Sequence, residues 1–230
     1  TGIALAYVLP HLPGLGRLIP RREHAASAQV AFRFNSFIGL ALVDRLAGPQ
    51  GVLMMAVLIG VCVPLFNVAA VWPMARHAQR GFLRELVRNP LIIGTASGLT
   101  ANLLGFTLPT LLEPTVTRMG AASLALGLMA AGAGMQLGAL RHDKTLAFSL
   151  LLIRHFVLPL AAFGWAQVFQ LDPTQTLVLL AFSALPTASS CYVLAARMGY
   201  DGAFVAGLVT LSTVLGVFSL PFALGILGGR

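Results

Sequence analysis

The feature that most restricts the fold of this chain is the uncharged stretch 173–196, which is apolar at both ends and polar in its middle. A stretch of this length can cross a bilayer as a helix. Its centre reads Leu185-Pro-Thr-Ala-Ser-Ser190, and a proline followed by three hydroxyl side chains indicates a broken helix. Backbone groups freed inside a bilayer are costly unless protein or a water-filled cavity satisfies them. A break at this depth therefore indicates a binding site, and a transporter is the first hypothesis.

Composition indicates a polytopic membrane protein. The chain is 57% hydrophobic and only 10% charged, whereas soluble domains carry roughly 25% charged residues. Cys62 and Cys191 both fall within apolar segments and have no spacing typical of metal ligands, so we predict neither a metal site nor a disulfide. The net charge of +8 is spread over short loops and not gathered on one segment, so nucleic acid is not an expected partner.

The apolar segments predict an all-α fold with eight membrane spans. The expected spans are residues 1–16, 26–43, 52–74, 89–106, 118–138, 146–169, 175–196 and 203–228. Within the fourth span, Asn89-Pro90 has the typical start of a helix, with an N-capping asparagine before a proline in the first turn.

The basic residues predict how these spans are oriented. Alternating the loops places ten basic residues on one side and three on the other. The larger set is Arg17, Arg21, Arg22, Arg76, Arg80, Arg84, Arg88, Arg141, Lys144 and Arg197, and the smaller set is Arg45, Arg118 and Arg230. The larger set predicts the cytoplasmic side, so both ends of the chain are expected on the outer side. Only Lys144 is a lysine and the other fourteen basic residues are arginine, a bias typical of a GC-rich bacterial genome, so we expect a bacterial inner membrane.

Two parts of the chain share a layout. At an offset of 151 residues, Asn35-Ser36 aligns with Pro186-Thr187, Gly48 with Gly199, and Gly51 with Gly202. We predict an inverted repeat, in which residues 1–75 are the remainder of a first unit, 76–88 a basic cytoplasmic linker and 89–230 a five-span second unit. The first unit then shows three spans, so two further helices are expected before Thr1. Paired broken helices in such repeats indicate a site at the bilayer midplane, with the first break at residues 33–39.

At these residues the sequence resembles the auxin efflux carrier family, relatives of the plant PIN-FORMED carriers within the bile acid/arsenite/riboflavin transporter superfamily. The resemblance rests on residues 33–42 with Gly48, 85–94, 129–140 and 185–220. It implies ten helices in two inverted five-helix repeats, of which eight are visible here, with two unwound helices crossing at the substrate site. It also implies transport of organic anions such as small carboxylates or auxin-like compounds. The family's first crossing helix commonly has a proline after its glycine, which Gly39-Leu40-Ala41 lacks.

The substrate-binding candidates are the polar and helix-breaking residues of the two breaks. They can either hydrogen-bond a carboxylate or satisfy the broken backbone locally, and they are Asn35, Ser36, Gly39, Pro186, Thr187, Ser189 and Ser190. The N-termini of half-helices also favour an anion.

Three basic side chains inside spans are further candidates. Arg33 either extends its charge to the cytoplasmic surface or attracts an anion. Arg154 and His155 lie in the sixth span, where ionisable residues indicate function by default, although a packed His155 is an equal alternative. All seven acidic residues fall in loops or at span ends, which argues against a carboxylate proton relay. Coupling to H⁺ through His155, coupling to Na⁺ through freed carbonyls, and uncoupled transport all stay open.

We therefore predict a secondary carrier for small organic anions that works by alternating access in the cell membrane. A sodium-coupled relative of the bile acid symporters is the alternative within transport, and a non-transporting sensor or interaction subunit is the alternative outside it. An enzyme is not predicted, because the sequence has no HExxH motif and no clear histidine partner for Ser189 or Ser190. No cofactor is expected, the lipid bilayer is an expected partner, and a homodimer is left open.

Overall fold

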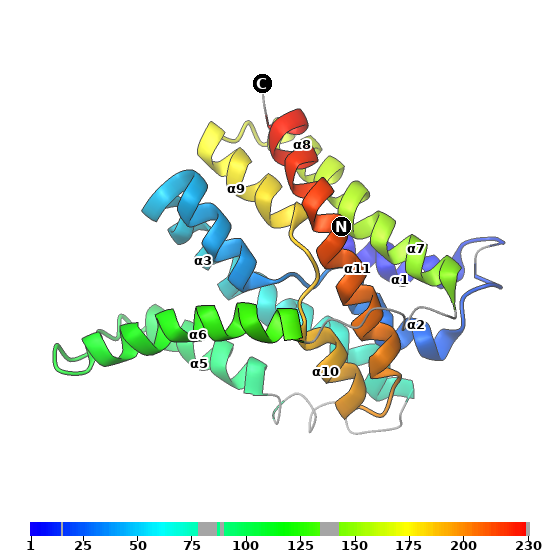
Figure 1. The fold of residues 1–230 in the computed structure, drawn as a ribbon, viewed down its shortest axis with the longest axis horizontal. Helices are drawn as coiled ribbons and strands as arrows, with labels where there is room; N and C mark the ends of the chain where they lie inside the picture. The colour runs from blue at the N-terminus through cyan, green and yellow to red at the C-terminus, as the bar shows by residue number, and fades with distance from the viewer. Residues whose placement is uncertain (15, 78–86, 88–89, 134–142, 229–230) are drawn as a thin grey trace.

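The computed structural model describes all residues except 15, 78–86, 88–89, 134–142 and 229–230, and every regular segment in it is helical (Figure 1). The elements in chain order are α1 (Gly2–Val8), η1 (Leu9–His11), α2 (Arg21–Ser27), η2 (Ala28–Ala31), α3 (Ser36–His77), α5 (Pro90–Leu103), α6 (Glu113–Ala133), α7 (Lys144–Leu152), the π-helix η3 (Ile153–Val157), α8 (Leu158–Val168), α9 (Pro173–Ala184), α10 (Ser190–Arg197), α11 (Gly202–Pro221) and the π-helix η4 (Phe222–Leu227). The all-α prediction is confirmed for this part of the chain.

Three helices of the described residues are long and apolar enough to cross a membrane by themselves. They are Ser36–Arg76, Lys144–Val168 and Gly202–Leu227. The eight predicted spans are thus not recovered as eight long helices. The second and seventh are divided by the breaks that the sequence predicts, and the shorter pieces Gly2–His11 and Pro173–Ala184 are apolar as well. The predicted linker at 76–88 and much of the resembling stretch 129–140 lie outside the described residues.

Two glycines bend the chain at corresponding positions of the predicted repeat. Gly48 interrupts α3 with φ 58° and ψ −151°, and Gly199 follows α10 with φ 80°. Positive φ is inexpensive only for glycine, which explains why this residue stands at both bends. Three residues beyond each bend, a Cβ on Gly51 or Gly202 would lie 2.6 Å or 2.8 Å from an alanine Cβ, so both glycines permit close packing. Both bends therefore have a glycine with positive φ, and these two glycines are 151 residues apart.

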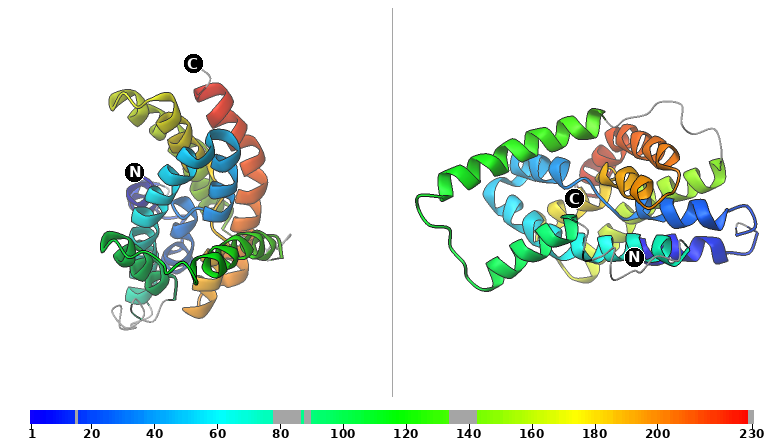
Figure 2. Two further views of the ribbon diagram at one scale, coloured as in Figure 1. Left: turned by 90° about the vertical axis from the view of Figure 1, so that its left-hand side faces the viewer. Right: turned by 90° about the horizontal axis from the view of Figure 1, so that it is seen from below.

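The core surrounds the two helix breaks. The largest buried cluster joins α1, η2, the second half of α3, α7, α10 and α11. A smaller cluster joins α3 and α9 through Phe34, Val43, Met55, Val178 and Leu185. The side and bottom views show these helices packed about one another, while α5 and α6 project together beyond them (Figure 2).

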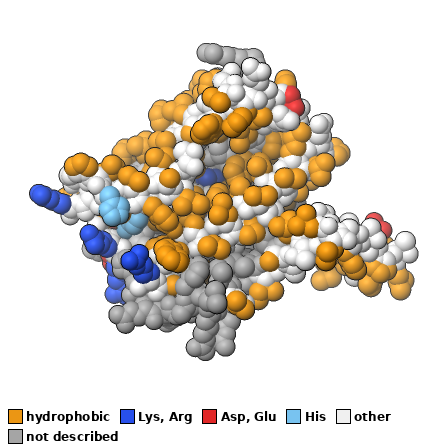
Figure 3. Space-filling model, turned by 180° about the vertical axis from the view of Figure 1, so that it is seen from behind, with side chains coloured by type: hydrophobic (Ala, Val, Ile, Leu, Met, Phe, Trp, Pro, Cys, Tyr) orange, Lys and Arg blue, Asp and Glu red, His pale blue; other side chains and the backbone are white. Residues whose placement is uncertain are grey.

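The surface is largely apolar, as expected of a protein in lipid. Exposed large hydrophobic side chains occur along the spanning helices, including Leu53, Phe148, Val217 and Phe218. On the face in Figure 3, hydrophobic side chains dominate, and the basic ones gather mainly toward one side. Most described side chains of α5 and α6 are exposed too.

Candidate functional site

Two interrupted helices meet backbone to backbone near the centre of the fold. The first interruption separates η2 from α3 at residues 32–35, and the second separates α9 from α10 at residues 185–189. Phe34 and Thr187 form an antiparallel β-bridge, and the Asn35 N–H donates to the Pro186 carbonyl at 2.9 Å. Sequence positions more than 150 residues apart are thereby joined at one point, which we call the crossing.

Pro186 explains the break between α9 and α10. Its ring disfavours the helical conformation of the preceding residue, and Leu185 is extended, with φ −56° and ψ 144°. The freed backbone groups are taken up by side chains from other helices. The Ser219 hydroxyl donates to the Ala184 carbonyl at 3.1 Å, and Arg154 Nε donates to the Leu185 carbonyl at 2.7 Å. Since buried backbone groups must be paired, these contacts allow the break to exist inside the protein.

Asn35 sets the end of the first break. Its Oδ1 accepts from the backbone N–H groups of Phe37 and Ile38 at 3.1 Å and 3.2 Å, which is an N-cap on α3. The prediction that the break extends to Gly39 is therefore wrong, because the cap starts the helix at Ser36. Gly39 instead permits close packing, since a Cβ there would lie 2.8 Å from Leu185 Cδ1. Asn35 thus ends the first break by starting α3, whereas Pro186 begins the second break by ending α9.

Arg33 points into the crossing and not to the cytoplasmic surface. Its side chain is 5% exposed, and it donates to Gln29 Oε1 at 2.7 Å and to Ser190 Oγ at 2.9 Å. Gln29 is held in turn, because its Nε2 donates to the carbonyls of Ala26 and Cys191. The guanidinium group is thus fixed beside the N-terminus of α10.

Thr187 satisfies the crossing itself. Its hydroxyl donates to the Val30 carbonyl at 2.8 Å and accepts from Ser212 Oγ at 2.9 Å, while its N–H donates to the same Ser212 oxygen. Its hydroxyl and its N–H are therefore both committed to protein partners. Of the two roles that the sequence leaves open, the contacts assign Thr187 to backbone satisfaction.

Arg154 and His155 support the crossing from the π-helix η3. His155 Nδ1 is 2.8 Å from Ser219 Oγ, and its Nε2 is 2.8 Å from Ser212 Oγ. Both serines in turn contact the break, so His155 joins two residues of α11 that bind the chain on either side of Pro186. Arg154 is 1% exposed, and its Nη2 has no hydrogen-bond partner within the described residues.

A cavity of about 250 Å³ lies at the crossing. Five predicted candidates line it, namely Arg33, Asn35, Ser36, Ser189 and Ser190. Gly39, Pro186 and Thr187 shape the crossing without lining this cavity, and Arg154 and His155 lie behind it. The apolar part of the lining is Phe34, Phe37, Ile59, Val63, Phe66 and Ala188.

Sequence reasoning missed one polar residue of this cavity, Asn67. It lies on α3, is 1% exposed, and has neither a donor for its Oδ1 nor an acceptor for its Nδ2 in the described part of the protein. An amide within the long apolar run that follows Gly51 was the available signal. Gln29, which orients Arg33, was missed as well.

The comparisons with known proteins bear on what this cavity serves. A family model described as "membrane transport protein" matches residues 72–224, which is about two thirds of the chain. The chain belongs to the membrane transport protein family. The match supports the resemblance to the auxin efflux carrier family but does not extend to the PIN-FORMED carriers or the wider superfamily. No curated protein and no solved structure matches the chain.

In this member of the membrane transport protein family, the crossing holds buried positive charge without a compensating carboxylate. Arg33 and Arg154 both lie close to the buried Cys191 side chain. No described acidic residue forms an ion pair with either guanidinium group, and none lines the cavity. The described residues also contain no group of three or more His, Cys, Asp or Glu that could hold a metal ion. Because a buried charge needs a counter-charge, the site suits an anion.

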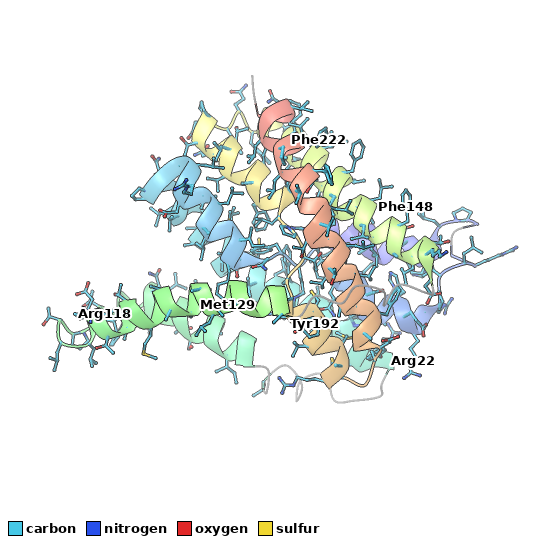
Figure 4. The ribbon with its side chains drawn as sticks, in the orientation of Figure 1. Arg22, Arg118, Met129, Phe148, Tyr192 and Phe222 are labelled. Carbon is cyan, nitrogen blue, oxygen red and sulfur yellow. The ribbon has the colours of Figure 1, made fainter. Side chains whose placement is uncertain are left out.

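A second, larger cavity of about 680 Å³ lies between the α7–η3 and α11–η4 helices. Phe148 and Phe222 lie toward its two ends (Figure 4). Apart from Lys144, His155 and Ser219, its lining is apolar, as expected of a surface that contacts lipid chains. Among the cavities of the described residues, the one at the crossing is thus partly polar, and the one on this flank is an apolar groove.

Proposed function

We propose that this membrane transport protein is a secondary carrier for small organic anions, with the substrate bound in the cavity at the crossing. The observation that carries the proposal is Arg33, a buried guanidinium group that lines the cavity and has no carboxylate partner in the described chain. Its guanidinium group donates to Gln29 and Ser190 and also interacts with the Cys191 side chain, which still leaves N–H donors of the five for a carboxylate.

The helix ends at the crossing favour an anion as well. Ser189 and Ser190 line the cavity at the N-terminus of α10, where unpaired N–H groups and the helix dipole carry partial positive charge. The carbonyl oxygens of Ala184, Leu185 and Pro186 already accept hydrogen bonds from protein donors. This supports an anion over a cation as the main ligand of the crossing, and so favours an organic-anion carrier over a sodium-binding one.

The proposed mechanism is alternating access by an inverted-repeat carrier in the bacterial inner membrane. The crossing is joined into one unit by backbone hydrogen bonds between the breaks and by the His155, Ser212 and Ser219 contacts behind them. We propose that this unit moves as one body, so that the cavity opens to one side of the membrane at a time. Protonation of His155 would change the hydrogen bonds that His155 shares with Ser212 and Ser219. This is the way in which a proton could be coupled to transport in the proposed mechanism.

Uptake of radiolabelled carboxylates into proteoliposomes tests the function. Arg33→Gln should lower uptake about tenfold or more, because a charged hydrogen bond to the substrate is lost, and Arg33→Lys should retain part of it. Arg118→Gln is the matched control, since Arg118 is exposed on α6, away from the crossing (Figure 4). Equal uptake by the Arg33→Gln and Arg118→Gln proteins would overturn the assignment of the site.

A further inference from the structure

The unpaired amide of Asn67 carries information about the substrate. Its side chain is almost fully buried, lines the crossing cavity, and offers a donor and an acceptor that no described protein group uses. A buried polar group without a partner is destabilising, and a ligand that pairs with it removes that penalty. The ligand of this cavity should therefore present both an acceptor to Nδ2 and a donor to Oδ1.

The charge of the lining limits the charge of the ligand. Of the described residues that line the cavity, Arg33 alone has a charged side chain. One guanidinium group in the lining can neutralise one carboxylate. Arg154 lies behind the crossing and does not line the cavity, so a second carboxylate would have no cation beside it there. An ammonium group is disfavoured too, because it would lie near Arg33 with no carboxylate of the protein beside it.

A carboxylate alone leaves Asn67 half satisfied, because an ionised carboxylate only accepts hydrogen bonds. The Oδ1 needs a neutral donor, and a hydroxyl group on the carbon next to the carboxylate supplies one. Such a ligand places an acceptor and a donor side by side, which matches the two ends of a primary amide. The cavity volume of about 250 Å³ and its apolar walls leave room for a short hydrocarbon remainder.

We propose that the substrate is a small 2-hydroxy monocarboxylate with an apolar side chain, and that Asn67 is the residue that selects the hydroxyl group. Arg33 binds the carboxylate and Asn67 pairs with the hydroxyl. This inference rests on the proposed function, since it assumes that the crossing cavity binds an organic anion.

Binding of four compounds to the full protein in nanodiscs tests the inference. They are 2-hydroxy-3-methylbutanoate, 3-methylbutanoate, 2-hydroxybutanedioate and valine, which differ in the hydroxyl, the second carboxylate and the ammonium group. We expect the first to bind about tenfold tighter than the second, because a buried polar group is left unpaired without the hydroxyl. The dicarboxylate and the amino acid should bind more weakly than the first.

Asn67→Leu provides the decisive variant. It should bring the affinity ratio of the hydroxy and deoxy acids close to one without weakening the deoxy acid. Its melting temperature should be equal to or above that of the parent, since an unpaired buried amide is removed. Asn102→Leu is the control, because it makes the same change on the exposed surface of α5.

Three results would overturn the inference. If carboxylates bind in an Arg33-dependent manner but the hydroxyl makes no difference in the parent protein, the role of Asn67 is refuted and the proposed function stands. If the dicarboxylate binds most tightly, the single-charge argument is refuted. If no carboxylate binds at all, the proposed function falls and this inference with it.

Discussion

The Asn35 N–H donates a hydrogen bond of 2.9 Å to the carbonyl oxygen of Pro186, which is the residue that the 151-residue offset aligns with it. One bond thereby joins equivalent positions of the two halves of the chain. Around it, Asn35 ends one break by capping α3, and Pro186 starts the other by ending α9. The two breaks have different chemical causes but occur at positions that the 151-residue offset aligns.

Asn35 both caps α3 and lines the cavity. We therefore predict that one substitution of Asn35 changes protein stability and another changes anion binding. Asn35→Ala should lower the free energy of unfolding by about 1 kcal/mol, because the N-cap of α3 is lost. Asn35→Asp keeps a capping oxygen and should unfold like the parent, but its negative charge should abolish anion binding. Thermal unfolding and carboxylate binding, measured on both variants, check this. Normal binding by Asn35→Asp would contradict an anion site at the crossing.

Gly39 lets the two breaks pack closely, so a larger side chain at this position should lower the stability of the protein. A Cβ at this position would lie 2.8 Å from Leu185 Cδ1, and Leu185 is fully buried, so it has little room to turn away. Gly39→Ala should destabilise the protein by about 1–3 kcal/mol through overpacking. Gly94→Ala is the matched control, since nothing lies within 4 Å of a Cβ there. Equal melting temperatures for the two variants would show that the crossing is not closely packed.

Ser212 is predicted to be the most sensitive side chain behind the crossing. It contacts the Thr187 N–H, the Thr187 hydroxyl and His155 Nε2, and it is fully buried. Ser212→Ala leaves the Thr187 N–H without a partner and should cost about 2 kcal/mol or more of stability. Within the described residues, the hydroxyl of the neighbouring Thr213 donates to Val209 of its own helix and to no other helix, so Thr213→Val should cost much less. Hydrogen exchange at the Thr187 amide would locate the effect, and unchanged protection in Ser212→Ala would refute it.

The sequence predicts the crossing well because its causes are local. A proline, a run of hydroxyl residues and an N-capping asparagine act on the backbone within a few residues, so both breaks can be found by inspection. Gly48 and Gly199 are recognisable for the same reason. The limits of the first break were misjudged at Gly39, where the decisive contact is with Leu185, far along the chain.

Roles that depend on distant contacts could not be predicted. The sequence leaves Thr187 open between substrate and backbone, and only the neighbouring Ser212 and Val30 decide between them. Likewise, Asn67 is one amide in an apolar helix, and its importance comes from lining a cavity together with two distant segments, 33–37 and 188–190. The burial of the Arg33 side chain depends on its hydrogen bonds to Gln29 and Ser190.

The two buried arginines also have an electrical consequence. In the proposed cycle, the empty crossing carries the charges of both Arg33 and Arg154, and binding one monoanion reduces this net charge by one. Moving an elementary charge through 100 mV changes its energy by about 2.3 kcal/mol. With the cytoplasm negative, the field draws the empty crossing inward more strongly than the loaded one. The membrane voltage then acts on the return of the empty carrier, so the protein itself moves charge in each cycle.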